Sequence, residues 1–307
     1  MALAIQSLVI WISCLSFLTN SIIVKPKPSP PKLERVSYHS KATDLERDYY
    51  VYLPEGFNQK DKWPVILFLH GNGERGDGKN DLDYTFIHGP IFEAWVQKRP
   101  LPFVIIVPQL PVFTQGEKGF IKNRNRSIIP YPKKDSLTSY RPAYTGTDLM
   151  DGIPSDSKMP YPKEGQEDGW NKIEHELLSM IDNTIKNFKG DDDRVYLTGL
   201  STGGFGVWYM GGTYADRFAA MAPVNAFGHP DLVPAIVASK LPIWCITGGR
   251  DPYVKIQYFY PAMNKLESLG HPEMRFTIHE DMGHIAWQRA YAGNDLYDWF
   301  LKFKKRT

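Results

Sequence analysis

One serine lies in a glycine-rich bend at the point where a run of strand-forming residues ends. The stretch RVYLTGLSTGGFG covers residues 194–206, and its segment GLSTG, residues 199–203, fits the pattern Gly-x-Ser-x-Gly around Ser201. In this pattern a tight strand-to-helix turn exposes the serine hydroxyl, and the following helix directs its positive N-terminus at the same point. We interpret Ser201 as a nucleophile. The alternative is a glycine-rich turn that binds phosphate or has no chemical role.

A serine nucleophile needs a base and an acid, and candidates for both follow Ser201 in the chain. Asp251 comes directly after the apolar run LPIWCITGG, and His284 lies in a glycine loop after the last such run. Taken singly, Asp251 could be a turn residue before Pro252, and His284 a loop histidine. The order Ser, Asp, His at successive strand ends favours catalytic roles. Asp281 is the rival acid, ranked lower because it shares the histidine's own loop.

Two backbone N–H groups are expected to bind the negatively charged oxygen that forms when a serine attacks a carbonyl. The first belongs to Thr202, directly after the nucleophile. The second is expected in the loop LFLHGNGERG, where we choose Asn72, with Gly73 as the alternative donor and a plain tight turn as the other interpretation. Each donor of this kind contributes about 3 kcal/mol of transition-state stabilisation.

The elements that must position these residues are visible as short apolar runs bounded by glycine and proline, which is typical of buried parallel strands. Residues 171–188 between two of the runs have helical spacing. Strands alternating with helices predict an α/β fold, a mainly parallel central sheet flanked by helices with the site at the carboxyl ends of the strands. Gly211 and Gly212 are expected to end the helix after Ser201 early. The runs are RDYYVYLP, WPVILFLHG, FVIIVPQ, RVYLTGL, FAAMAPVNA, LPIWCITGG and RFTIHED.

Composition and charge limit the classes of partner. The 307 residues carry a net charge of +2, which gives no indication of nucleic acid or an acidic membrane surface as partner. The two cysteines, Cys14 and Cys245, form neither a disulfide framework nor a zinc-site spacing. Cys245 is expected to be a small core residue.

The N-terminus differs from the rest of the chain. Residues 1–24 contain no charged side chain, and residues 25–33 form a proline- and lysine-rich linker. We expect an export signal, a secreted or periplasmic protein, and a catalytic domain over residues 34–307. A retained membrane anchor, or a lipoprotein attached at Cys14, is the alternative. Any membrane contact would then run through this segment alone.

A long segment separates the run FVIIVPQ from the helix near Asn171. Such a connection usually takes only a few residues, whereas this one covers about 113–169. Its prolines oppose long regular structure, its tyrosines offer ring surfaces, and its lysines and arginines make it basic. We expect a lid or wall over the active site that sets substrate choice, so that its removal spares small esters. A solvated surface loop is the alternative.

Taken together, the blocks FLHGNGERG, VIIVPQLP, RVYLTGLSTGGFGVW, DRFAAMAPVNA, PIWCITGGRDPYV and DMGHIAWQRAY resemble the α/β-hydrolase superfamily. The resemblance is to its dienelactone-hydrolase-like and polyhydroxybutyrate-depolymerase-like esterases, some of which are labelled predicted peptidases. It implies a catalytic triad of Ser201, Asp251 and His284, with no metal and no cofactor. Relatives usually carry Met where this chain has Thr202, a change that keeps the N–H donor.

We therefore expect a serine hydrolase that cleaves carboxylic esters, acting on a small-molecule or polysaccharide ester such as a plant polysaccharide or aryl ester. The alternative is a serine peptidase of the prolyl-oligopeptidase-like type, although the sequence has no counterpart of that family's propeller domain. A non-catalytic binding protein would not need all three triad residues. The acyl group, the alcohol and the oligomeric state stay open.

Overall fold

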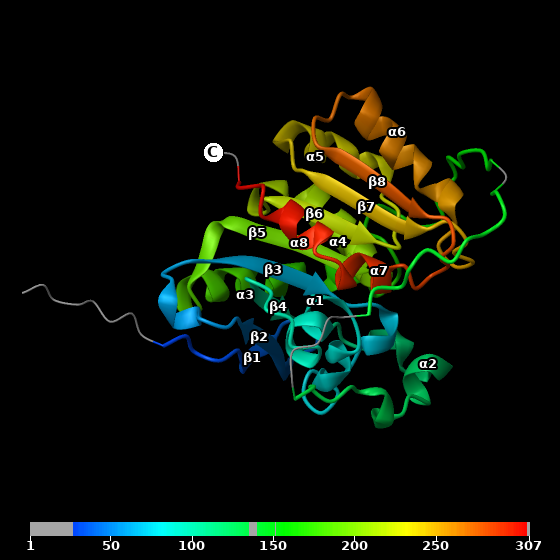
Figure 1. The fold of residues 1–307 in the computed structure, drawn as a ribbon. Coiled ribbons are helices and arrows are strands. Elements are labelled where there is room, and N and C mark those ends of the chain that lie inside the picture. Colours follow the sequence, from blue (N-terminus) through cyan, green and yellow to red (C-terminus); the bar gives the residue numbers. More distant parts are fainter. Residues whose placement is uncertain (1–26, 135–139, 151, 306–307) are drawn as a thin grey trace, which may run out of the picture.

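The computed structural model describes residues 27–134, 140–150 and 152–305. Within them, eight strands form one sheet in the order β1-β2-β4-β3-β5-β6-β7-β8 (Figure 1). The pairs β1–β2 and β2–β4 are antiparallel, and all other neighbours are parallel. This confirms the predicted α/β fold with a mainly parallel sheet. The strands are β1 Lys32–Ser40, β2 Leu45–Leu53, β3 Trp63–Leu69, β4 Val104–Val107, β5 Gly190–Leu200, β6 Ala220–Val224, β7 Ile243–Gly248 and β8 Met274–His279.

The seven predicted runs are β2 to β8. The edge strand β1 was not predicted, because it alternates between exposed and partly buried residues and so lacks a continuous apolar run. It begins at Lys32, inside the expected linker. Residues 1–24, the expected export signal with Cys14, lie outside the described residues. In the part of the chain that is described, no helix has the length and apolar character needed to cross a membrane.

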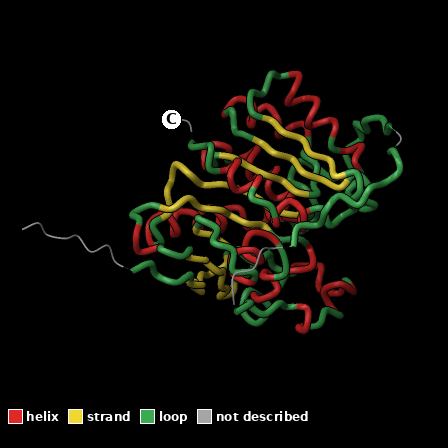
Figure 2. Tube along the Cα trace, viewed as in Figure 1, coloured by secondary structure: helices red, strands yellow, loops and turns green. Residues whose placement is uncertain are grey.

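Helices cover both faces of the sheet (Figure 2). Along β3, Val65, Leu67 and Leu69 pack into one hydrophobic cluster with α3 to α6, while Ile66 and Phe68 pack into the other with α1, α7 and α8. This alternation is the two-residue period of a strand that is buried on both faces. The helices are α1 Gly89–Ile91, α2 Gly119–Lys122, α3 Glu174–Asn187, α4 Thr202–Thr213, α5 Val233–Ser239, α6 Tyr260–Ser268, α7 Trp287–Ala292 and α8 Asp295–Phe300.

The helix after Ser201 corrects one expectation. Gly211 and Gly212 do not end it early, since α4 continues through both to Thr213. A Cβ at position 211 would lie 2.2 Å from Met221 Sδ, and one at position 212 would lie 2.7 Å from Leu232 Cβ. The two glycines therefore allow α4 to pack closely against β6 and the segment before α5, and this packing outweighs their poor helix propensity.

The segment 113–169 connects β4 to the turn before α3. Its described part contains only short helical turns and α2 (Gly119–Lys122). Its green chain runs along the edge of the sheet toward which the β3, β7 and β8 arrows point (Figure 1). In a mainly parallel sheet, that edge is where ligands bind. We call residues 113–169 the insertion from here on.

Candidate active site

Ser201 occupies the predicted turn between β5 and α4. Its backbone has φ 51° and ψ −118°, a conformation rarely adopted by a residue with a side chain. The turn leaves no room beside the serine, because a Cβ at position 203 would lie 1.9 Å from Leu69 O. The N–H of Ser201 donates to Val224 O at 2.9 Å. Gly203 is thus required by the close approach of the end of β3, and the strained turn is held by β6.

The structure brings Ser201, His284 and Asp251 into one hydrogen-bonded chain. Ser201 Oγ lies 3.0 Å from His284 Nε2, and His284 Nδ1 lies 2.6 Å from Asp251 Oδ2. The other carboxylate oxygen of Asp251 accepts the N–H groups of Tyr253 and Val254, each at 2.9 Å. Burial raises the pKa of Asp251, but the hydrogen bonds from His284 and these N–H groups outweigh it and lower that pKa below its ordinary value. Asp251 is therefore held as a carboxylate beside the imidazole.

The rival acid has a different partner. Asp281 forms a bidentate ion pair with Arg289, with both N–O distances at 2.7 Å. These hydrogen bonds hold the pKa of Asp281 far below its ordinary value. Arg289 also donates to the carbonyls of Pro142 and Ala143 in the insertion. The Asp281–Arg289 pair thus ties the insertion to the loop that carries His284.

The two expected oxyanion donors begin helical turns. Thr202 is the first residue of α4, and Asn72 is the first residue of the short turn Asn72–Glu74. The first N–H groups of a helix have no carbonyl partner within it, so both can point at a ligand. The loop after β3 also lies against the end of β5, since a Cβ at position 71 would come within 2.8 Å of Leu200 Cδ1.

Comparisons with known proteins bear on the fold of the chain. No family model matches the chain. A 48-residue stretch is 49% identical to poly(3-hydroxyalkanoate) depolymerase C of Paucimonas lemoignei, but it makes up 16% of this chain and only 12% of that protein. A thermostable esterase superposes with a TM-score of 0.58 at 21% identity, covering 89% of this chain, which spans 63% of the esterase.

Two further structures are similar. The S-formylglutathione hydrolase of Staphylococcus aureus gives a TM-score of 0.57 at 14% identity over 90% of this chain and 98% of its own. The acylaminoacyl peptidase of Pyrococcus horikoshii gives 0.55 at 15% identity, over 90% of this chain and 42% of its own. The chain has the α/β-hydrolase fold. The fold implied by the sequence resemblance is thereby confirmed.

Asn225 is a residue of the candidate site that sequence reasoning missed. It directly follows β6, is fully buried and has a positive φ of 50°. Its Nδ2 donates to Asp251 Oδ2 at 3.1 Å, the same oxygen that binds His284. Its place at the carboxyl end of a strand was the available signal.

His70 orients the loop after β3, residues 70–76, which carries the expected oxyanion donor Asn72 and which we call the oxyanion loop after that expectation. Leu110 N donates to His70 Nε2 at 2.9 Å, so the ring proton lies on Nδ1, which is 2.6 Å from Gly71 O. A peptide unit is planar and trans, so fixing Gly71 O also fixes the opposite direction of the Asn72 N–H. Burial lowers the pKa of His70 to about 3, which keeps the ring neutral in this role.

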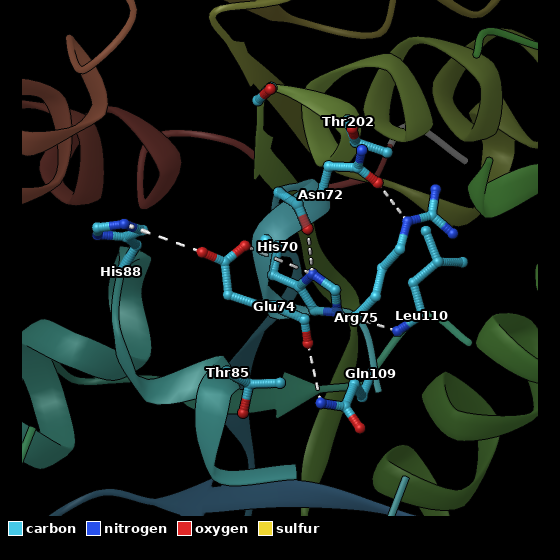
Figure 3. Close-up of polar contacts among 12 residues, drawn as sticks. His70, Asn72, Glu74, Arg75, Thr85, His88, Gln109, Leu110 and Thr202 are labelled. Carbon is cyan, nitrogen blue, oxygen red and sulfur yellow. Dashed lines mark hydrogen bonds and ion pairs between the residues drawn. The ribbon is translucent and has the colours of Figure 1, made fainter. Parts of the chain in front are cut away.

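Glu74 in the same loop is a buried carboxyl group. Its oxygens lie 3.7 Å from His70 Nδ1 and 3.9 Å from His88 Nε2 (Figure 3). Burial raises the pKa of Glu74 to about 7 and lowers that of His88 to about 4. Both histidines are therefore neutral at pH 7, and neither contact is an ion pair. Among the described residues, Glu74 Oε2 has no hydrogen-bond partner.

Two cavities among the described residues are large enough to be considered as substrate sites. One of about 400 Å³ lies between β1, β2 and α3, and no triad residue lines it. The other, of about 270 Å³, is not lined by a triad residue either, but the ring centroid of its wall residue Trp287 lies 5.2 Å from that of His284. Because its wall contacts His284, the smaller cavity is the better candidate for a substrate site, and we call it the Trp287 pocket. Its lining includes His88, Phe92, Gln97, Lys133, Tyr140 and Trp287. No group of three His, Cys, Asp or Glu in the described residues could hold a metal ion.

Proposed function

We propose that the protein is a serine hydrolase that cleaves carboxylic esters through an acyl-enzyme. The observation that carries this proposal is the hydrogen-bonded chain from Ser201 through His284 to Asp251. Ser201 Oγ attacks the ester carbonyl while His284 Nε2 takes its proton. His284 then gives that proton to the leaving alcohol, and Asp251 stabilises the imidazolium that exists between the two transfers. Water hydrolyses the acyl-enzyme by the same route in reverse.

The developing oxyanion needs donors that are already in place. We assign this role to the N–H groups of Thr202 and Asn72. The loop packing at Gly71 and the hydrogen bond from His70 to Gly71 O support the second assignment. Donors fixed before the reaction do not reorganise during it, which makes them more effective than water.

The Trp287 pocket suits a ring-bearing ester. Trp287, Phe92 and Tyr140 present aromatic surfaces, and Gln97 and Lys133 supply polar groups to the same cavity. Offset or edge-on ring contacts each add about 0.5–1.5 kcal/mol to the burial of an aromatic group. We propose that this pocket takes an aryl group or a sugar ring of the ester, and that the insertion, which supplies Lys133 and Tyr140, forms its outer wall.

A serine peptidase is the second candidate, favoured by the similarity to acylaminoacyl peptidase. That protein is more than twice as long as the stretch the two chains share, and the described residues here form a single sheet with its helices. An amide also demands proton delivery to nitrogen and closer substrate positioning. Ester hydrolysis therefore requires fewer structural elements beyond the observed site than peptide hydrolysis does.

Matched substrates and a covalent probe test the proposal. We expect a fluorophosphonate to label Ser201, as read by peptide mass mapping, and an ester to be cleaved much faster than the amide of the same acyl group. The panel consists of p-nitrophenyl acyl esters, feruloyl esters, acetylated xylan and chromogenic peptides. Labelling at another residue would contradict the nucleophile assignment. Equal rates on ester and amide would favour the peptidase.

A further inference from the structure

Arg124 of the insertion reaches under the oxyanion loop. It follows α2, and its side chain is only 8% exposed although its neighbours Asn123 and Asn125 are exposed. Its Nη1 donates to Gly73 O at 3.0 Å and also to Arg75 O. An arginine 50 residues away in the chain thus holds two backbone carbonyls of the segment that begins at Asn72.

The remaining groups around Arg124 fix the guanidinium itself. Its Nη2 donates to Asp81 Oδ2 at 2.8 Å, and its central carbon lies 3.9 Å from the centre of the Tyr84 ring. A buried guanidinium that is paired with a carboxylate and stacked on a ring loses little further freedom when it binds carbonyls. Arg124 is therefore a preformed support for the loop.

Other contacts hold neighbouring parts of the loop, since Gln109 Nε2 donates to Glu74 O at 2.9 Å and His70 Nδ1 lies 2.6 Å from Gly71 O. A Cβ at position 73 would meet nothing within 4 Å, so Gly73 has no packing on that side. The Arg75 side chain provides a further tie, since its Nε binds Asn72 Oδ1 (Figure 3) and its Nη1 donates to Pro111 O and Asp168 O, each at 2.9 Å. Asp168 near the end of the insertion, and Pro111 just before its start, therefore attach to the side chain of Arg75, whose carbonyl Arg124 holds.

We propose that Arg124 is a positioning residue for the oxyanion hole, so that the insertion supports catalysis on every substrate and does not only select among them. The inference rests on the proposed serine hydrolase function. It also revises the expectation that removing the insertion would spare small esters. If Arg124 holds the loop, the loss of its donors will move the Asn72 N–H away from the oxyanion position, and small and bulky esters will be affected alike.

The test compares Arg124→Met with Arg126→Met. Methionine keeps the apolar stem and removes the donors. Arg126 is a matched control because it lies in the same segment, 5.9 Å from the same Tyr84 ring, and binds Asn80 O and Asp83 but no atom of residues 72–75. For R124M we expect kcat on p-nitrophenyl acetate to fall at least tenfold with KM changed less than twofold. R126M is expected to match the wild type.

A second readout separates positioning from a merely structural role. A trifluoromethyl ketone forms a tetrahedral adduct whose oxygen occupies the oxyanion hole, whereas the product carboxylic acid does not mimic that state. We expect R124M to bind the ketone at least tenfold more weakly while its affinity for the acid stays within twofold. Arg124→Lys, which keeps the charge but not the planar fork, should recover part of the loss.

The outcomes are distinct. An unchanged ketone affinity in folded R124M, or an equal loss in R126M, would overturn the proposal. If R124M does not fold, R124K decides, with at least a threefold loss of ketone affinity supporting the proposal and wild-type affinity overturning it. A wild-type protein that neither hydrolyses esters nor reacts with a fluorophosphonate at Ser201 would instead refute the proposed function, and this inference with it.

Discussion

The Thr202 hydroxyl donates a hydrogen bond to Gln166 Oε1 at 2.7 Å. The residue directly after the proposed nucleophile is therefore bound to the last part of the insertion. Most relatives that the sequence resembles carry methionine at this position, which could not form the bond. The side-chain amide of Gln166 in the insertion therefore contacts the residue next to Ser201.

Breaking this contact should change selectivity more than rate. Thr202→Val keeps the backbone N–H and removes the hydroxyl, so we expect turnover of a small acetyl ester to stay within about threefold of the wild type. Gln166→Leu should change the ratio of kcat/KM values for acetyl and feruloyl esters, and the double variant should show no further change. Additive effects of the two substitutions would mean that the residues are not coupled.

The two candidate acids should differ sharply on substitution. Asp251→Asn would favour the wrong tautomer of His284 and should lower kcat by about 10⁴-fold. Asp281→Asn breaks the pair with Arg289 but leaves the triad intact, so its loss of kcat should be far smaller. Steady-state kinetics on one aryl ester compares the two. A larger loss in D281N would reverse the assignment.

The rate should fall as the pH is lowered, since protonated His284 cannot accept the serine proton. Asp251 stays a carboxylate as the pH is lowered toward its ordinary pKa, because its own pKa is held below that value. A kcat/KM profile on p-nitrophenyl acetate checks the direction. A profile that does not fall toward low pH would contradict a histidine base.

Asn225→Gly should weaken catalysis without breaking the fold. Glycine tolerates the positive φ at this position but cannot donate to Asp251, so we expect a loss of about 1–2 kcal/mol in transition-state stabilisation, roughly 5- to 30-fold in kcat. Asn225→Ala should lose the same activity and be less stable, because alanine is strained at this φ. Wild-type kcat in N225G would show that the Asn225 bond is dispensable.

Glu74 should make stability depend on pH. Its folded-state pKa of about 7 lies above the ordinary 4.5, so the folded protein holds this proton more tightly than the unfolded chain. The stabilisation that this proton gives to the folded state is complete below pH 4.5 and is lost as the pH rises to about 7. It amounts to roughly 3 kcal/mol in the free energy of unfolding. Glu74→Gln stays neutral, so urea unfolding at pH 5 and 8 should show wild type losing stability relative to E74Q. A constant difference would contradict a buried protonated carboxyl.

The chain order of Ser201, Asp251 and His284 was readable because each follows a strand that can be recognised in the sequence, and parallel strands bring their carboxyl ends to one edge. The supporting contacts were not readable in the same way. Asn225 and Arg124 act across 26 and about 50 residues respectively, through partners whose positions depend on the folded sheet and on loop conformation. Nothing local distinguishes Arg124 from Arg126, which lies two residues away and binds elsewhere.

The glycines at 211 and 212 show the same limit. Their sequence context is that of a helix end, and only tertiary packing against Met221 and Leu232 explains why the helix continues. The edge strand β1 escaped prediction for the converse reason, since exposure on one side leaves its sequence without a distinctive apolar run.

In the parallel pairing of β3 with β5, Leu69 stands opposite Gly199. Asn72 and Ser201 follow these two residues by three and two positions, so the loop of the expected donor and the turn of the proposed nucleophile begin at a single residue pair of two adjacent strands. Neighbouring strands lie about 4.8 Å apart in any sheet, whatever their side chains. Strand pairing therefore sets where the loop of Asn72 and the turn of Ser201 begin, whereas contacts such as those of His70 and Arg124 set how the N–H groups of the loop are directed.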